Sequence, residues 1–251
     1  DNEYALKIIH PELKNQVYFF IKLISFYKYI VNNIYCFKKY QIFFDLKNFI
    51  NNLLLKFDMN NEFQNMKYFY ETYNKNNKII IPQPFISHKN LLIMQYIDGE
   101  YFHDLNVSDI KKQEIYCVLN MFFRDNVYYR KLIHADLHPY NWKIINPEND
   151  YKIVIYDYGY IIKILDKQSI MDFSYYHYTD NIQKMGEVLY KYTINKNISL
   201  EQFNSNLYKY LNENIIKLVP FSNELVTDIY NFLYIQNYKL NSELFDFILT
   251  T

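Results

Sequence analysis

Glycine, proline and cysteine are all scarce in this sequence. Its 251 residues include 3 Gly, 6 Pro and 2 Cys. Two cysteines, Cys36 and Cys117, cannot form the disulfide framework of a small secreted domain, so we interpret both as buried thiols of a protein from a reducing compartment. Because glycine is so rare, each one that remains is expected at a position where a side chain would not fit.

The chain also lacks an excess of charge of either sign and a long uninterrupted apolar run. Lys and Arg number 27, and so do Asp and Glu. This balance provides no field that steers the chain toward nucleic acid, so no nucleic-acid partner is expected. Lys22 and Lys28 interrupt the apolar stretch 17–31, which is too short for a membrane span. We therefore expect no transmembrane segment, and any membrane association would be peripheral.

Aromatic and apolar residues are plentiful. The chain has 29 Tyr and 20 Phe, and hydrophobic residues make up 50% against 22% charged. These proportions are those of a globular chain with a sizeable core, and they exclude disorder. We interpret the aromatic abundance as the codon bias of an AT-rich genome. The first residue is Asp1 rather than Met, so we expect a piece of a longer protein.

Strands and helices alternate along the first part of the chain. Apolar residues at three- and four-residue spacings predict helices over 12–39, 45–73 and 108–129. Apolar runs bounded by turn residues predict strands over 4–9, 78–81, 90–96, 142–145 and 152–156. This order predicts an α+β fold.

Other parts of the chain are not expected to continue this alternation of strands and helices. Pro82 and Pro84 are expected to stop the second strand. The segment Leu132–Asn141 is expected to be irregular. From Gly159 to the end the pattern predicts helices only.

The informative segment is HADLHPYN, residues 134–141, followed after a pair of strands by Asp157-Tyr158-Gly159. Asp136 precedes Asn141 by five residues, which is the spacing of the kinase catalytic loop H-R-D-x-x-x-x-N. In that loop the Asp accepts the acceptor's proton and the Asn holds a metal. Oxygen ligands of this kind suit Mg²⁺. The pattern predicts Asp136 and Asn141 as catalytic residues, and Asn141 and Asp157 as metal ligands.

A lysine near the start of the chain has the setting of a phosphate-binding residue. Ala5-Leu6-Lys7 is similar to the V-A-I-K strand of kinases, whose Lys contacts the phosphates of ATP. Lys7 is therefore predicted to be both catalytic and nucleotide-binding. Such a lysine needs a helical Glu to orient it. Glu62 is the best candidate and Glu71 the second.

The segment Met94–Gly99 fits the hinge of a kinase, where a strand ends and its backbone meets an adenine edge. By position Met94 would be the gatekeeper. The carbonyl of Gln95 and the N–H of Ile97 would face the base. We predict all three as nucleotide-binding residues.

Together these segments resemble the UbiB/ADCK family of atypical protein-kinase-like proteins, which is linked to coenzyme Q and isoprenoid-lipid metabolism. The resemblance extends over roughly residues 1 to 185 and rests on the segments YALKIIHPEL, KFDMNNEFQNM, LIMQYIDG, HADLHPYN and IVIYDYGYIIKILD. It places the family's helical Glu on Glu62 and its Asn on Asn65.

The resemblance implies a protein-kinase-like two-lobed fold. A small, truncated N-lobe would cover residues 1–97, and a larger, mainly helical C-lobe would cover 98–251. ATP and Mg²⁺ would be the ligands, and the reaction would be phosphoryl transfer or ATP hydrolysis. The acceptor would be a lipid or a small molecule. A mitochondrial, plastid or membrane-associated location is implied by the family alone.

Some features depart from the family's pattern. Lys56 stands where the family's E-x-D segment has Glu, and Asp58 keeps the Asp. Tyr140 replaces a Gly and Tyr158 replaces a Phe. The family's nucleotide-covering loop and K-x-G-Q extension precede its lysine, and we expect them to lie outside this chain.

Three alternatives remain open at this point. Small-molecule kinases of the aminoglycoside phosphotransferase and choline kinase type carry H-G-D-L-H-P-x-N, which is close to HADLHPYN. A pseudokinase that binds nucleotide without turnover would fit the departure at Lys56. In a metallohydrolase, the alternating His134, Asp136 and His138 would be metal ligands on one face of an extended segment.

Overall fold

The computed structural model describes residues 3–34, 46–195, 197–213 and 223–241. Contacts divide the chain into two units. Unit 1 contains residues 1–17 and 51–163, and unit 2 contains residues 18–50 and 164–251. Every residue predicted to bind nucleotide or metal belongs to unit 1. The lobe boundary between residues 97 and 98 stays a prediction, because these units are defined by contacts rather than by lobes.

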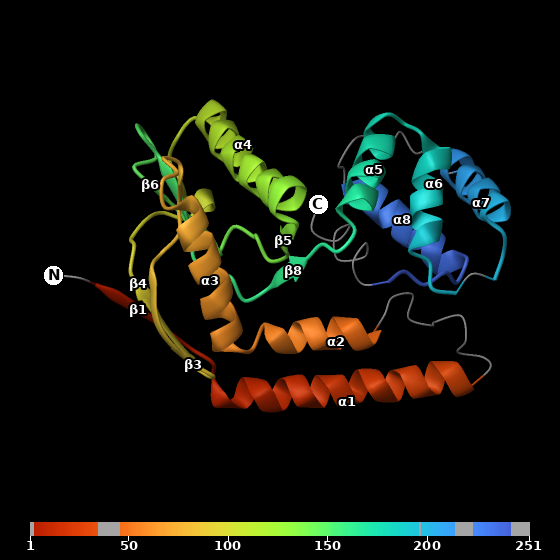
Figure 1. Ribbon diagram of the computed structural model, residues 1–251, viewed down its shortest axis with the longest axis horizontal. Coiled ribbons are helices and arrows are strands. Elements are labelled where there is room, and N and C mark those ends of the chain that lie inside the picture. Colours follow the sequence, from red (N-terminus) through yellow and green to blue (C-terminus); the bar gives the residue numbers. More distant parts are fainter. Residues whose placement is uncertain (1–2, 35–45, 196, 214–222, 242–251) are drawn as a thin grey trace. The chain divides into compact units, whose positions relative to one another are not determined.

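Unit 1 begins with an antiparallel sheet in the order β1-β4-β3 (Figure 1). Its strands are β1 (Tyr4–Ile8), β4 (Leu91–Gln95) and β3 (Pro84–His88). Lys7 pairs with Leu92 in this sheet. Side chains alternate along a strand, so Lys7 points to the same side as the partly buried Ala5, while the intervening Leu6 is exposed. Helix α3 (Met59–Tyr73) packs against β3 and β4.

The second strand ends before Pro82, as expected, but strand β3 begins at Pro84 and was not predicted. Pro84 is the first residue of the strand, and β3 lies at the edge of the sheet. Proline is tolerated there because the missing N–H is not needed on the free side of an edge strand. The second predicted strand is shorter than expected and is β2 (Ile79–Ile80).

The helix predicted over 45–73 is two helices. Helix α2 (Leu46–Leu55) ends before Lys56, and α3 begins at Met59. Asp58 caps α3, because its carboxylate accepts a hydrogen bond from the N–H of Asn60 at 3.0 Å. The turn between the helices places Lys56 just before the start of α3, close to Glu62.

The rest of unit 1 holds the loops of the predicted catalytic segment. Helix α4 (Asp109–Asp125) begins at the Ser108 cap and continues into a π-helical turn, Asn126–Arg130. Strand β7 (Lys152–Ile155) lies between β2 and β6 (Trp142–Ile145). The 3-10 turn Phe102–Asp104 follows the predicted hinge.

Two short strands correct the sequence analysis. The segment predicted to be irregular contains β5 (Leu132–His134), and the segment predicted to be helical contains β8 (Ile161–Lys163). They pair with each other, His134 opposite Ile161. Three-residue strands carry too little periodicity to be recognised from sequence, and only their pairing defines them.

An aromatic core holds unit 1 together. Phe69 of α3 contacts Tyr158, with ring centroids 4.8 Å apart, and also contacts Tyr73 and Phe122. Tyr158 and Trp142 are among the largest fully buried side chains. The core therefore connects α3, which carries Glu62, to the chain on either side of Asp157.

Unit 2 is helical, as predicted. It contains α5 (Lys167–Tyr178), α6 (Ile182–Lys191), α7 (Leu200–Glu213) and α8 (Asn223–Ile235). Helix α6 packs against both α5 and α7. Helix α1 (Pro11–Asn33) begins in unit 1 and ends before the predicted residue 39; residues 35–39 lie outside the described part of the chain.

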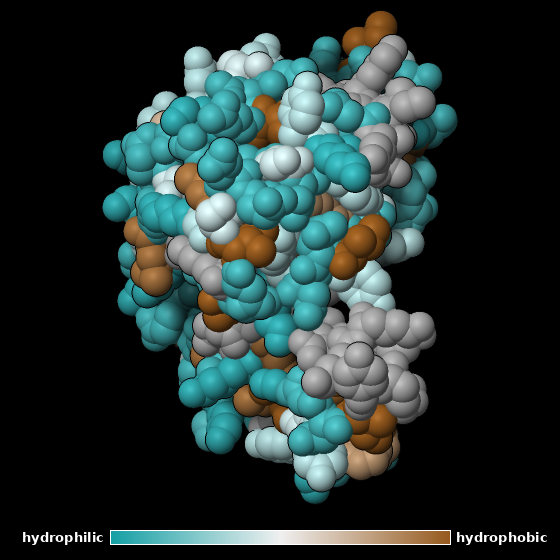
Figure 2. Space-filling model, turned by 90° about the vertical axis from the view of Figure 1, so that its right-hand side faces the viewer, coloured by the Kyte–Doolittle hydropathy of each residue, from teal (hydrophilic) through white to brown (hydrophobic). Residues whose placement is uncertain are grey.

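The surface is mixed in character. In the view of Figure 2, hydrophilic side chains dominate, and hydrophobic ones lie among them singly or in small groups. Among the helices that the structure describes, none has both the length and the apolar character needed to span a membrane. Cys117 is a free thiol and is exposed, which corrects the expectation that it is buried. Cys36 lies outside the described residues.

Candidate functional site

Lys7 forms ion pairs with two carboxylates that are distant in the sequence. Its Nζ lies 2.7 Å from Oε1 of Glu62 and 2.9 Å from Oδ2 of Asp157. Of the two candidates, Glu62 and Glu71, the first and preferred one makes the pair, and Glu71 is exposed. The sheet, α3 and the loop after β7 therefore bring one cation and two anions together at a single point.

Burial and charge compete in this cluster. Burial raises the pKa of Glu62, and the nearby Lys7 ammonium offsets that effect only in part. Burial also opposes the charge on Lys7, but Glu62 and Asp157 outweigh it, so the pKa of Lys7 is raised. For Asp157, the attraction of Lys7 and a hydrogen bond from Gly159 N–H outweigh burial and lower the pKa. A charged Lys7 is therefore held between carboxylates.

Glu62 has the most restricted environment of the three. Its side chain is 0% exposed. Oε1 accepts from Lys7 and, at 3.3 Å, from the N–H of Tyr158. Oε2 is buried and has no hydrogen-bond partner among the described residues. Such a group is costly to bury, and it persists here because it anchors Lys7.

His134 connects the two loops of the site. Its Nε2 lies 2.6 Å from the carbonyl oxygen of Asp157, and its Nδ1 accepts from the N–H of Asp136 at 3.4 Å. Burial lowers the pKa of His134, so the ring is neutral, with Nε2 as the donor. The imidazole thus fixes the Asp136 loop against the Asp157 loop.

Asn141 turns back onto the residue five positions earlier. Its Nδ2 donates to the backbone oxygen of Asp136 at 2.8 Å, and the side chain is buried. Because the amide nitrogen is used in this bond, the amide oxygen is the atom left for a ligand. The five-residue spacing therefore defines a closed loop that presents an Asp and an Asn together.

Lys56 lies against the predicted catalytic aspartate. Its Nζ forms an ion pair with Oδ2 of Asp136, and the ring of Tyr160 lies 6.0 Å away. His138 Nε2 lies 3.6 Å from the other oxygen, Oδ1. The sequence marked Lys56 only as a departure from a family pattern. No local sequence signal marks this pair, because it depends on where the turn between α2 and α3 lies in space.

The segment after Asp157 packs closely beneath the site. The carbonyl of Tyr158 accepts from Nδ2 of Asn65 at 2.9 Å. A Cβ built on Gly159 would lie 3.4 Å from both Asp157 Oδ1 and the backbone oxygen of Lys56. These are ordinary contacts, so Gly159 does not meet the expectation that a side chain would not fit. Gly99 meets this expectation, because a Cβ there would lie 2.8 Å from the backbone oxygen of Ile144.

The predicted hinge residues lie at the end of β4. Met94 is buried and pairs with Ala5 of β1. Gln95 N–H donates to Gln83 O at 2.8 Å. The N–H of Ile97 has no hydrogen-bond partner within the described part of the chain. Their contact with a base stays a prediction.

The ligand set of the metallohydrolase alternative is not formed. No group of three or more His, Cys, Asp or Glu side chains in the described ranges could hold a metal ion. Both ring nitrogens of His134 contact backbone atoms instead. We therefore set aside His134, Asp136 and His138 as a shared metal centre.

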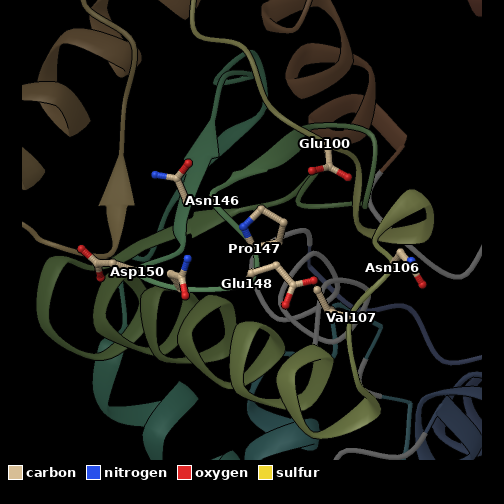
Figure 3. A pocket seen from close by; sticks show the side chains of 8 residues that line it. Glu100, Asn106, Val107, Asn146, Pro147, Glu148 and Asp150 are labelled. Carbon is tan, nitrogen blue, oxygen red and sulfur yellow. The ribbon is translucent and has the colours of Figure 1, made fainter.

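A separate pocket of about 420 Å³ lies elsewhere in unit 1. Figure 3 shows its lining, which comes from the chain after β4 and from the β6–β7 turn and consists mainly of polar residues: Glu100, Asn106, Val107, Asn146, Pro147, Glu148, Asn149 and Asp150. No residue of the Lys7 cluster lines it, so this pocket is not the site described above.

Known proteins share this chain's sequence pattern and fold. Residues 1–189 match the model of the ABC1 atypical kinase-like domain. The ABC1 family protein MCP2 of Saccharomyces cerevisiae is 29% identical over an alignment of 104 residues, which covers 37% of this chain and 18% of the yeast protein. This chain therefore matches less than a fifth of that relative's length.

A solved structure shares this chain's fold. The Rv3197–erythromycin complex from Mycobacterium tuberculosis has a TM-score of 0.59 and 14% identity, covering 99% of this chain and 67% of that one. The Rio2 kinase from Chaetomium thermophilum has a TM-score of 0.35, which is too low to assign a fold. The α+β, kinase-like fold predicted from the sequence is confirmed, and so is the family resemblance. With three quarters of its length matched, this chain is a member of the ABC1 atypical kinase-like family.

Proposed function

We propose that this protein binds a nucleoside triphosphate with Mg²⁺ and transfers or hydrolyses its terminal phosphoryl group. One observation carries the proposal: a single series of hydrogen bonds, which passes through the ring of His134, links four residues that lie far apart in the sequence, Lys7, Asp157, Asp136 and Asn141. Ion-pair networks can also be purely structural. Here, however, the fully buried Glu62 is used to hold a lysine beside a second carboxylate.

The residues present fit Mg²⁺. Asp157 supplies a carboxylate whose pKa is lowered, so it is ionised at neutral pH. Asn141 supplies an amide oxygen. Mg²⁺ takes oxygen ligands, usually one or two from the protein with phosphates and water completing the set. When bound, Mg²⁺ would neutralise phosphate oxygens and polarise the terminal phosphoryl group.

Each side chain of the cluster has a distinct role in this proposal. Lys7 contacts the phosphates and is held in place by Glu62. Asp136 accepts a hydrogen bond from the attacking hydroxyl or water and takes up its proton as the new P–O bond forms. The leaving diphosphate departs with the electron pair of the broken P–O bond. His134 stays neutral and keeps the two loops in register. These side chains contribute to the reaction mostly by positioning the reacting groups and neutralising their charge.

The acceptor is best assigned as a small molecule or a lipid-linked group. Ala135 stands where protein kinases have the Arg of H-R-D, so this loop lacks the cation that pairs with a phosphorylated activation loop. Between Gly159 and the start of α5 at Lys167 there is room only for β8 and short connections. A segment of this length does not form a long peptide-docking loop.

Titration calorimetry of the purified protein tests the proposal. We expect Mg-ATP and Mg-ADP to bind, and binding to be lost when EDTA removes Mg²⁺. Absence of binding would contradict the proposal. Binding without release of phosphate, in any assay with or without acceptors, would instead favour the pseudokinase alternative.

A further inference from the structure

Lys56 is a second cation at the proposed site, and the nucleotide-binding role given to Lys7 does not explain it. It lies between α2 and α3, three positions before Met59, the first residue of α3. Its side chain is 33% exposed, and that of its partner Asp136 is 20% exposed. The ammonium group therefore lies at the edge of the site rather than on the open surface.

The backbone of Lys56 is also part of the site. Its carbonyl oxygen and Oδ1 of Asp157 are each 3.4 Å from the point where a Cβ on Gly159 would lie. The two oxygens are therefore no farther apart than twice that distance. Lys56 thus lies beside the proposed metal ligand through its backbone and beside the proposed catalytic residue through its side chain.

The ammonium group of Lys56 has donors left for a ligand. A lysine has three N–H donors. Within the described residues, Asp136 is the acceptor hydrogen-bonded to Nζ, and the Tyr160 ring lies 6.0 Å away. Lys7, in contrast, already donates to both Glu62 and Asp157. An incoming anion would find more free donors on Lys56 than on Lys7.

The balance of charges at the site also supports a ligand-binding role for Lys56. Three carboxylates, those of Glu62, Asp136 and Asp157, face two ammonium groups, those of Lys7 and Lys56. Without Lys56, Asp136 would lie uncompensated next to the place where a terminal phosphate develops charge. Like charges close together oppose binding and reaction.

We propose that Lys56 both positions Asp136 and binds the terminal phosphate of the nucleoside triphosphate, a role that rests on the proposed function. A residue near the γ-phosphate distinguishes triphosphate from diphosphate, whereas a merely structural ion pair does not. The proposal therefore predicts a change in the ratio of the affinities for Mg-ATP and Mg-ADP, which can be measured without turnover.

Calorimetry with Mg-ATP and Mg-ADP on the wild-type protein and on Lys56→Met tests this role. We expect Lys56→Met to weaken Mg-ATP about tenfold and to leave Mg-ADP within about twofold, since one charge-assisted hydrogen bond is lost. Lys56→Arg should restore most of the ATP affinity. Lys78→Met is the matched control, because Lys78 is equally exposed at 32% and is also paired with an acid, Asp150.

The outcomes separate the two proposals. Failure of the wild-type protein to bind either nucleotide overturns the proposed function, and the role of Lys56 with it. Binding by the wild type, with an ATP-to-ADP affinity ratio unchanged or raised in Lys56→Met, overturns the role of Lys56 alone. If Lys56→Met does not fold, Lys56→Gln carries the same comparison, because it keeps a donor and removes the charge.

Discussion

Nε2 of His134 lies 2.6 Å from the carbonyl oxygen of Asp157, 23 residues later in the chain. The histidine is buried, and its other nitrogen accepts the N–H of Asp136. One neutral side chain therefore determines the distance between the loop that carries the proposed base and the loop that carries the proposed metal ligand.

Substitution of His134 tests this link. We expect His134→Leu to lower the free energy of unfolding by about 2–3 kcal/mol, because two backbone groups lose a buried partner. Urea unfolding followed by circular dichroism measures the change. The control is His88→Leu on the exposed edge of β3, which should change stability by less than about 0.5 kcal/mol. Equal stability of the two variants would show that the His134 bonds are unimportant.

Glu62→Gln separates stability from function. The substitution keeps the shape and a hydrogen-bond acceptor for Lys7 but removes a buried charge whose pKa is raised by burial. We therefore expect the free energy of unfolding to change by less than about 1 kcal/mol. Mg-ATP affinity should fall about tenfold, because a neutral amide holds the Lys7 ammonium less firmly than a carboxylate does. A variant that binds nucleotide as tightly as the wild type would contradict the anchoring role.

The two glycines of unit 1 should respond differently to alanine. In Gly99→Ala the new Cβ would lie 2.8 Å from a backbone oxygen, so we expect a loss of stability of about 1–3 kcal/mol. In Gly159→Ala the nearest atoms are 3.4 Å away, so the protein should remain stable. The methyl group would nevertheless touch Asp157, and we expect weaker Mg-nucleotide binding. Thermal unfolding and calorimetry on both variants check the contrast.

Asp166 gives a pH-dependent prediction in unit 2. It caps α5 through Ser169 N–H and pairs with Lys191, and these contacts lower its pKa to about 2. A lowered carboxyl pKa stabilises the fold above the unfolded pKa of 3.8, and that stability disappears as the pH falls through about 2. At pH 7 the free energy of unfolding of the wild type should therefore exceed that of Asp166→Asn. The difference should be at most about 1 kcal/mol, because solvent screens the ion pair.

The same measurement at lower pH checks the sign. The difference between wild type and Asp166→Asn should shrink steadily between pH 4 and pH 2. A difference that grows toward low pH would mean that the assigned ion pair does not stabilise the fold.

The sequence predicted those parts of the fold that depend on local pattern. Strand β1, the helices of unit 2 and the capped start of α4 follow from periodicity and capping residues. Strands β5 and β8 were missed because three-residue strands are defined only by their pairing partner. The break at Lys56 was missed because the apolar spacing continues through it, and only the Asp58 cap marks the new start.

The candidate site likewise divides into residues that a local sequence pattern predicts and residues that it does not. Lys7, Glu62 and Asp157 could be named because their residue types and spacings are those of a known chemistry, and the structure places them in contact. The Lys56–Asp136 pair could not be named, since it depends on where a turn between two helices lies in space. No local pattern in a sequence carries that information.

The central claim is that Asp157 holds the Mg²⁺ of a bound nucleotide. Calorimetric titration of Mg-ATP into wild type, Asp157→Ala and the exposed control Asp150→Ala tests it most directly. We expect wild type and Asp150→Ala to bind alike, only with Mg²⁺ present, and Asp157→Ala to lose at least about tenfold in affinity. Mg-dependent binding of equal strength in Asp157→Ala would contradict the account.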